Sequence, residues 1–197
     1  MNYRLVTFLS VLVFLFTMGC AGKIKQNFLN EPYRNKRVSV ELAITGIEVA
    51  DARAAVDTGT LIIPGFTFKK IGDTIVPPLS VIEEKAIKDE IAQYAQGGKT
   101  AVRVKATIKT GIKEYSMGFF NSREFAGAAV NIDLLDTIHN TQLFSTTGEA
   151  SYEVKSIRAD TAFLESLYRK ALKTCVYKAF ENIEDYLENR LKEENHK

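Results

Sequence analysis

The chain has 197 residues, of which 46% are hydrophobic and 25% charged, and its formal net charge at neutral pH is +2. This length and apolar content predict one domain of ordinary size with a substantial core. The near-neutral balance provides no basic face, so we expect no nucleic-acid partner. Two histidines and two cysteines make a structural zinc site or another cofactor site unexpected.

The first twenty residues have the pattern of an export signal. Arg4 is the only charge before Cys20, and residues 5–18 are almost continuously apolar. A positive start followed by a short apolar run is typical of a signal peptide, and the run is too short for a membrane-spanning helix.

The signal ends on Thr17-Met18-Gly19-Cys20, which resembles the signal of a bacterial lipoprotein. The resemblance implies that residues 1–19 are removed and that Cys20, carrying acyl chains such as palmitate, anchors the protein. Ala21 is not the aspartate that retains such proteins in the inner membrane, which implies a place at the outer membrane, facing the periplasm. The alternative is an ordinary cleaved signal peptide that contains a cysteine.

Residues 20–37 are expected to form a tether between the anchor and the domain. This segment contains five basic residues and one acidic residue, Glu31. A basic segment beside a lipid anchor can lie on anionic head groups, or it can be a solvated linker. Both interpretations stay open.

Residues 38–44 alternate between apolar and polar side chains, which predicts a half-buried strand. Gly46 is expected to bend this strand, and Ile47 and Val49 continue it in the opposite phase. Residues 60–68 predict a second, short strand at an edge of the sheet, because Pro64-Gly65 interrupts it.

Ser80 and Glu83 form a capping box, which predicts the start of a helix. We expect an apolar face toward the core, an acidic and basic face toward solvent, and an end at Gly97-Gly98. The predicted apolar face contains Ile82, Ala86, Ile87, Ile91, Tyr94 and Ala95, and the predicted solvent face contains Glu83, Glu84, Lys85, Lys88, Asp89 and Glu90.

Further alternation predicts strands over 102–109, 128–134 and 144–154, the last with a bulge at Gly148. The last two strands should form a long antiparallel hairpin, with its turn at His139-Asn140. Residues 111–124 are expected to be a loop or an irregular hairpin.

Asp160 is a good N-cap for a terminal helix whose apolar stripe continues to Leu191. Such a helix of roughly 48 Å exceeds the about 30–35 Å width of a domain of this size. Residues 188–197 should therefore overhang as a charged tail. Cys175 lies on the apolar stripe and is expected to be a buried structural thiol, since a catalytic cysteine needs a nearby histidine.

These elements predict an α+β domain over residues 38–187, with an antiparallel sheet and both helices on one face. Phe119 and Phe120 stand together in the segment that follows the third strand. They could form an exposed patch for a partner or a lipid, or they could fold back onto the core.

Asp57-Thr58-Gly59 matches the signature of aspartic proteases. Such an enzyme needs two carboxylates that share a proton, so a chain with one signature would have to dimerise. The other interpretation is a turn in which Gly59 adopts a positive φ. We find no other arrangement of residues that predicts catalysis.

The order of elements resembles the outer-membrane lipoproteins of the YajG type, and more distantly the lipoprotein domains of curli secretion and of activators of peptidoglycan synthesis. The residues that carry the resemblance are Asp51-x-Arg53, Arg103, the strand Ala128-x-Val130-x-Ile132-x-Leu134, Asp136 and Tyr152. The resemblance implies a periplasmic α+β domain without enzymatic activity.

The sequence thus predicts a non-enzymatic, lipid-anchored envelope protein that binds or scaffolds another envelope component. Two alternatives are a lipid-handling protein with an apolar groove between sheet and helices, and an aspartic protease.

Overall fold

The computed structural model describes residues 38, 40–64, 69–95, 97–98, 100–118, 121–156 and 160–194. The chain divides into two units, Met1–Glu31 and Pro32–Lys197, and every described residue belongs to the second. Cys20, the tether, Phe119 and Phe120 lie outside the described residues, so the expectations placed on them stay predictions.

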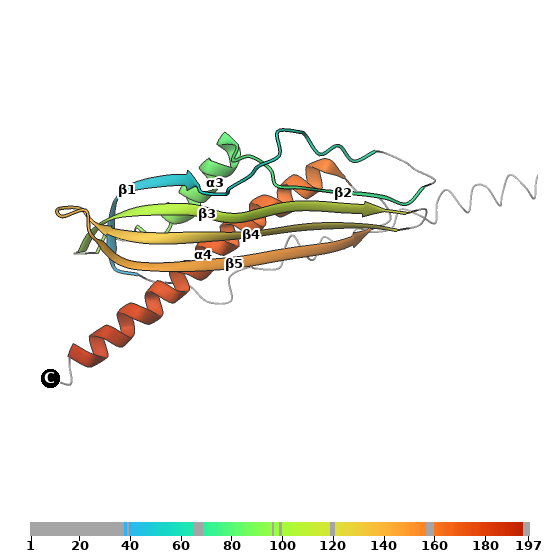
Figure 1. The fold of residues 1–197 in the computed structure, drawn as a ribbon. Helices are drawn as coiled ribbons and strands as arrows, with labels where there is room; N and C mark the ends of the chain where they lie inside the picture. Colours follow the sequence, from blue (N-terminus) through green and yellow to red (C-terminus); the bar gives the residue numbers. More distant parts are fainter. Residues whose placement is uncertain are drawn as a thin grey trace, which may run out of the picture. The chain divides into compact units, whose positions relative to one another are not determined.

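The described domain contains a five-stranded sheet with the order β1-β3-β4-β5, in which β2 also pairs with β3 (Figure 1). The strands are β1 (Leu42–Asp51), β2 (Ile71–Ile75), β3 (Thr100–Met117), β4 (Ser122–Asp136) and β5 (Gln142–Ser156). The first half of β3 pairs with β1 and its second half with β2.

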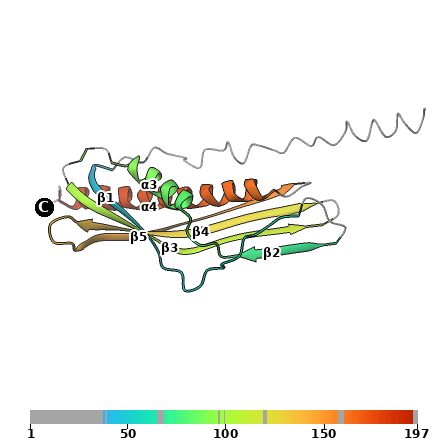
Figure 2. The ribbon, with the colours of Figure 1, turned by 90° about the horizontal axis from the view of Figure 1, so that it is seen from above.

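Two helices, α3 (Val81–Ala92) and α4 (Thr161–Glu194), lie on the same side of the sheet (Figure 2). The predicted α+β class is therefore confirmed. One strand pairing differs from the expected antiparallel arrangement, since β1 runs parallel to β3. The connection between them includes a helix, and such a crossover brings the chain back in the same direction.

Both helices begin where their caps predict. The Ser80 hydroxyl accepts from the Glu83 N–H, and the Glu83 carboxylate accepts from the Ser80 N–H. At the start of α4, an Asp160 carboxylate oxygen accepts from the Ala162 N–H at 2.9 Å. Each contact satisfies backbone donors that the first turn of a helix leaves without partners.

The prediction of a strand over residues 60–68 is wrong for the residues that the structure describes. Residues 60–64 have no regular structure, and residues 65–68 lie outside the described part of the chain. The edge strand is β2, where Ile71 pairs with Met117 and Ile75 pairs with Lys113. A partner for β2 exists only because β3 continues past its predicted end.

Residues 111–117 and 122–124, expected in a loop or an irregular hairpin, belong to regularly paired strands, with β3 ending at Met117 and β4 starting at Ser122. The register of β3 against β4 shifts between Ile108 and Thr110. Beyond this irregularity the core-facing residues change phase, so Lys113, a charged residue, points inward. A change of phase hides the continuation of the strand from a search for simple alternation.

The first strand bends where predicted, with a register shift between Ile44 and Gly46, but it starts at Leu42 rather than at residue 38. The bulge expected at Gly148 is wrong, because the β4–β5 register shifts instead between Leu134 and Leu135. Gly148 has a different role, since a Cβ added to it would lie 1.9 Å from the carbonyl oxygen of Cys175 on α4. Glycine there lets the helix backbone approach the strand.

Small side chains extend this close contact between α4 and the sheet. Ala171, Cys175 and Ala179 on α4 are fully buried. The Cys175 thiol donates to the Ala128 carbonyl at 3.1 Å, and burial raises its pKa to about 12. The prediction of a buried structural thiol is confirmed.

The face that α3 turns toward the core is rotated from the predicted one. Glu83 and Glu90 are buried although they were expected in solvent, whereas Ile82 is 64% exposed. Glu90 accepts from the hydroxyl of Tyr94 at 3.1 Å, and the Tyr94 ring stacks on Phe180 of α4 at 4.2 Å. Hydrogen-bonded carboxylates can therefore occupy this interface, and apolar periodicity alone does not identify it.

Gly148→Ala tests the close contact of α4 with β5. The added methyl group must displace helix backbone, so we expect a loss of at least about 2 kcal/mol of stability, which lowers the melting temperature by at least about 4 °C. Gly59→Ala is the matched control, because a Cβ at Gly59 meets nothing within 4 Å. Equal melting temperatures of the two variants would contradict the contact.

Candidate functional site

The strongest candidate site is a cavity of about 540 Å³ between one end of the sheet and the last turns of α4. We call it the apolar groove. Its lining comes from the start of β1, β3 and β5, the end of β4 and the last turns of α4. The apolar lining consists of Val40, Leu42, Val102, Leu134, Leu143, Phe144, Tyr186 and Leu187.

The groove exists because the spacing between α4 and β5 changes along their contact. At Gly148 the helix backbone lies against the strand. Four residues earlier in β5, the ring of Phe144 stacks on Tyr186 of α4 at 4.2 Å between ring centroids. Two aromatic rings occupy far more space than a glycine and keep the end of α4 away from the sheet. Figure 1 shows this end of α4 diverging from the strands.

The polar lining of the groove is mostly acidic. Glu41, Glu188 and Arg190 are exposed, whereas Glu184 is 6% exposed, and Thr100 completes the polar lining. Three carboxylates and one guanidinium group thus accompany a lining that is otherwise apolar. Such a composition is typical of sites where a few polar groups orient an apolar ligand.

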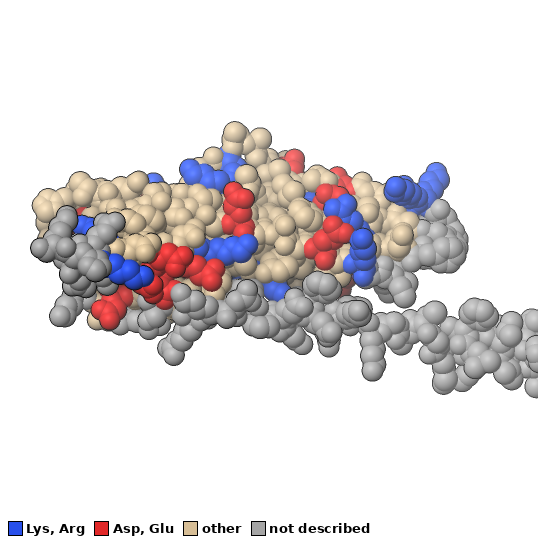
Figure 3. All heavy atoms as spheres, turned by 90° about the horizontal axis from the view of Figure 1, so that it is seen from below, with Lys and Arg blue, Asp and Glu red and all other residues tan. Residues whose placement is uncertain are grey.

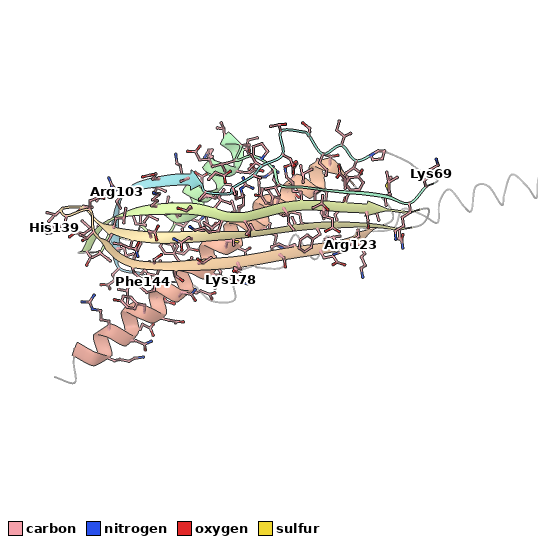
Figure 4. The ribbon with its side chains drawn as sticks, viewed as in Figure 1. Lys69, Arg103, Arg123, His139, Phe144 and Lys178 are labelled. Atoms are coloured by element: carbon pink, nitrogen blue, oxygen red, sulfur yellow. The ribbon has the colours of Figure 1, made fainter. Side chains whose placement is uncertain are left out.

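The turn between β4 and β5 adds one exposed apolar side chain, Ile138, to the same end of the sheet, next to the exposed Leu143 of the groove lining. Ile138 is 82% exposed and Leu143 47% exposed. Within the turn, Asp136 accepts from the Ile138 N–H at 2.8 Å and contacts His139 at 2.7 Å. The N–H of Ile138, followed by the contact with His139, lowers the pKa of Asp136. Figure 4 places His139, Arg103 and Phe144 at this end.

A second polar cluster surrounds Lys113, in the part of β3 beyond the register shift. Its ammonium group lies 2.7 Å from both carboxylate oxygens of Glu165 on α4 and 3.9 Å from Glu83 on α3. Lys113 and Glu83 are both buried. A buried charge is tolerated only when opposite charges surround it, so this cluster ties both helices to β3.

The Asp51-x-Arg53 pair extends that cluster. Arg53 donates to Asp51 at 2.7 Å, and its guanidinium group lies 3.5 Å from both the Tyr168 hydroxyl and the Gly111 carbonyl oxygen. The hydrogen bond from Arg53 lowers the pKa of Asp51, and burial raises that of Tyr168 to about 12. The Arg53 charge is matched by Asp51 at the surface of the domain, which indicates a structural role.

Asp57, the carboxylate of the Asp-Thr-Gly segment, contacts the chain just after β2. Its side chain accepts from the Val76 N–H, and its own N–H donates to the Val76 carbonyl at 2.8 Å. The expected positive φ of Gly59 is wrong, since Gly97 is the one glycine with that conformation in the described part of the chain. These contacts indicate a structural turn for the segment.

Neither a metal site nor a membrane span is found in the described domain. No group of three or more His, Cys, Asp or Glu residues there is arranged to hold a metal ion. Its helices also lack the combination of length and apolar character that crossing a membrane requires.

The sequence predicted an apolar groove only as an alternative, placed it between sheet and helices, and named no residue that lines it. The lining comes from five elements that are distant along the chain. Within each element, the lining residues follow the same apolar pattern as ordinary core residues, so the sequence does not distinguish them. Two weak signals were available: the apolar pair Leu143-Phe144, which breaks the alternation of β5, and the apolar stripe of α4 that continues past Ile183.

No family model matches the chain, and no curated protein matches it. Among solved structures, it is similar to a candidate lipoprotein from Caulobacter crescentus CB15, with 15% identity and a TM-score of 0.31, over 56% of this chain and 81% of that one. It is also similar to a DUF330 protein from Xanthomonas campestris, with 15% identity and a TM-score of 0.42, over 78% and 95% of the two chains. At these TM-scores neither similarity carries an argument about function.

Asp57→Asn tests the protease alternative. The amide retains an oxygen that can accept from the Val76 N–H, so we expect an unchanged melting temperature and an unchanged phenotype of cells that carry the variant. A protease would lose its function, because an amide cannot share the proton of a catalytic carboxylate pair. Loss of the phenotype at unchanged stability would restore the enzyme hypothesis.

The buried carboxyl group of Glu124 should make the stability of the fold depend on pH. This carboxylate is 1% exposed on β4 and accepts from the Asp160 N–H at the start of α4. Burial raises its pKa from 4.5 to about 7. The folded state thus binds this proton more tightly than the unfolded state, and the resulting stabilisation is complete below pH 4.5 and disappears as the pH rises through 7.

Glu124→Gln should remove this dependence, because the amide stays neutral while its oxygen still accepts from Asp160. We expect the wild-type chain to lose stability between pH 5 and pH 8 by up to about 3 kcal/mol and the variant to lose less, as measured by urea unfolding. Glu149→Gln, at an exposed position of β5, is the control. Parallel pH profiles for Glu124→Gln and wild type would contradict the prediction.

Proposed function

We propose that this chain is a non-enzymatic, lipid-anchored protein of the cell envelope that binds another envelope component in the apolar groove. The observation that carries the proposal is the groove itself, with its largely apolar lining and volume of about 540 Å³. This volume lies within the about 300–1,000 Å³ of sites that hold small molecules or protruding side chains.

The N-terminal sequence supports the envelope location. Signal residues 1–19, Cys20 and the tether 20–37 precede the domain, and Ala21 favours the outer membrane over the inner one. The tether leads directly to Val40 and Leu42, which line the groove. Twenty residues span at most about 70 Å, so the anchor would keep the groove near a membrane surface, on the periplasmic side. The resemblance to the YajG type agrees with this proposal.

The described charges support a binding role over a catalytic one. Lys113, Arg53 and their acidic neighbours hold elements of the fold together. Asp57 accepts a hydrogen bond from the backbone of Val76. On the side of the domain seen in Figure 3, acidic and basic side chains occur in mixed groups separated by uncharged surface. A protein or lipid partner fits this surface better than nucleic acid does.

Cys20→Ala tests the anchor, and Cys175→Ala is its matched control. We expect Cys20→Ala to stop processing or to release a soluble periplasmic form, since the variant lacks the acyl chains, which together bind a membrane far more firmly than one chain does. Cys175→Ala should stay in the outer-membrane fraction. The measurement is fractionation of cells after a salt wash, followed by separation of inner and outer membranes.

Retention of Cys20→Ala in the washed membrane fraction would contradict anchoring by lipid. Recovery of the wild-type chain with the inner membrane would contradict the outer-membrane location.

A further inference from the structure

We propose that the apolar groove holds one acyl chain of a zwitterionic phospholipid whose head group carries a primary ammonium group. This inference rests on the proposed function, because the anchor supplies the nearby membrane, and it names the component that the groove binds. Three observations carry it: the groove's lining, the exposed apolar residues beside it, and the charges among its polar residues.

The lining fits a hydrocarbon chain. The sheet side of the groove is formed by Leu42, Val102 and Leu134, which come from three different strands, and by Val40, which precedes β1. All four are almost fully buried. Leu187 and the Tyr186 ring form the helix side. Aliphatic side chains on both sides provide dispersion contacts and exclude water, while they offer few hydrogen-bond partners to a polar ligand.

The exposed residues at this end favour a membrane as the source of that chain. Ile138 and Leu143 present apolar side chains to solvent on the turn and the strand beside the groove. The tether from Cys20 also ends at residue 37, three residues before Val40 of the groove lining. Apolar side chains near a lipid anchor add to membrane affinity, because each inserts beyond the head groups. A lipid could then enter the groove from the membrane surface.

The charges of the groove favour a zwitterionic head group over an anionic one. Glu41 and Glu188 are exposed and acidic, Arg190 is exposed and basic, and Glu184 adds a buried carboxylate. An ammonium group can pair with the exposed carboxylates of Glu41 and Glu188, while the positive charge of Arg190 attracts a phosphate. A head group with negative charge alone would meet three carboxylates and one guanidinium group, which disfavours it.

The full lipidated chain, purified from membranes, is reconstituted into vesicles that contain a phosphatidylethanolamine with a diazirine at the end of one acyl chain. After illumination, mass spectrometry locates the cross-links. We expect them at residues that line the groove, and at least tenfold less cross-linking in Thr100→Trp, whose indole fills the groove from an exposed position. Thr147→Trp is the matched control on the sheet face away from the helices and should cross-link like wild type.

The head group is tested by the same measurement with a phosphatidylglycerol probe that carries the identical acyl chain. We expect wild type to prefer phosphatidylethanolamine by at least fivefold. Glu188→Lys should abolish or reverse this preference, whereas Asp185→Lys, at an exposed position on the same helix but outside the lining, should keep it. Melting temperatures confirm that all four variants fold.

Chain length provides an independent readout. Lysophosphatidylethanolamines of increasing length compete with the probe, and each added methylene should improve competition by about fourfold until the groove is full. A competitor series without length dependence would contradict acyl-chain binding in the groove.

Cross-links confined to the turn residues, or equal in wild type and Thr100→Trp, would overturn the proposal by showing surface contact alone. Equal cross-linking of the two lipids would overturn the assignment of the head group. A protein captured in the groove of the chain in living cells, in place of a lipid, would also overturn the proposal and still agree with the proposed function. Failure of the lipid anchor, by contrast, is measured by the fractionation of Cys20→Ala, which is independent of the cross-linking result.

Discussion

The structure depends on the close approach of α4 to the sheet at Gly148. The Cys175 carbonyl occupies the space where any other residue at Gly148 would place its Cβ, and the Cys175 thiol donates to the Ala128 carbonyl. This contact brings a long helix against two long strands and sets the path along which the rest of α4 lies. The groove follows from the same path, because Phe144 of β5 stacks on Tyr186 further along α4, and these two bulky rings hold the end of the helix off the sheet.

A register shift within β3 is the second feature on which the arrangement of the domain depends. The shift between Ile108 and Thr110 changes which side of β3 faces the helices. Lys113 therefore points into the domain, where Glu83 and Glu165 balance its charge. Replacing one partner of such a buried set leaves an uncompensated charge, so these residues act as a unit. The same change of phase extends β3 far enough to pair with β2.

The groove and the N-terminal anchor form one functional arrangement in our proposal. Val40 of the groove lining follows the tether by three residues in the sequence, and the exposed Ile138 and Leu143 lie at the same end of the sheet. A protein held in this way would meet the membrane with the part of its surface that is suited to apolar ligands. The buried charges around Lys113, in contrast, keep the helices in place and stay inside the domain.

Local interactions are what the sequence by itself determined. The capping box at Ser80, the N-cap at Asp160, the buried thiol of Cys175 and the turn at His139-Asn140 each depend on residues close in the chain or on one helical stripe. Only the tertiary structure decided the parallel pairing of β1, the role of Gly148, the inward position of Lys113 and the groove. Each of these depends on which distant segments meet and at what spacing, and no pattern within a single segment contains that information.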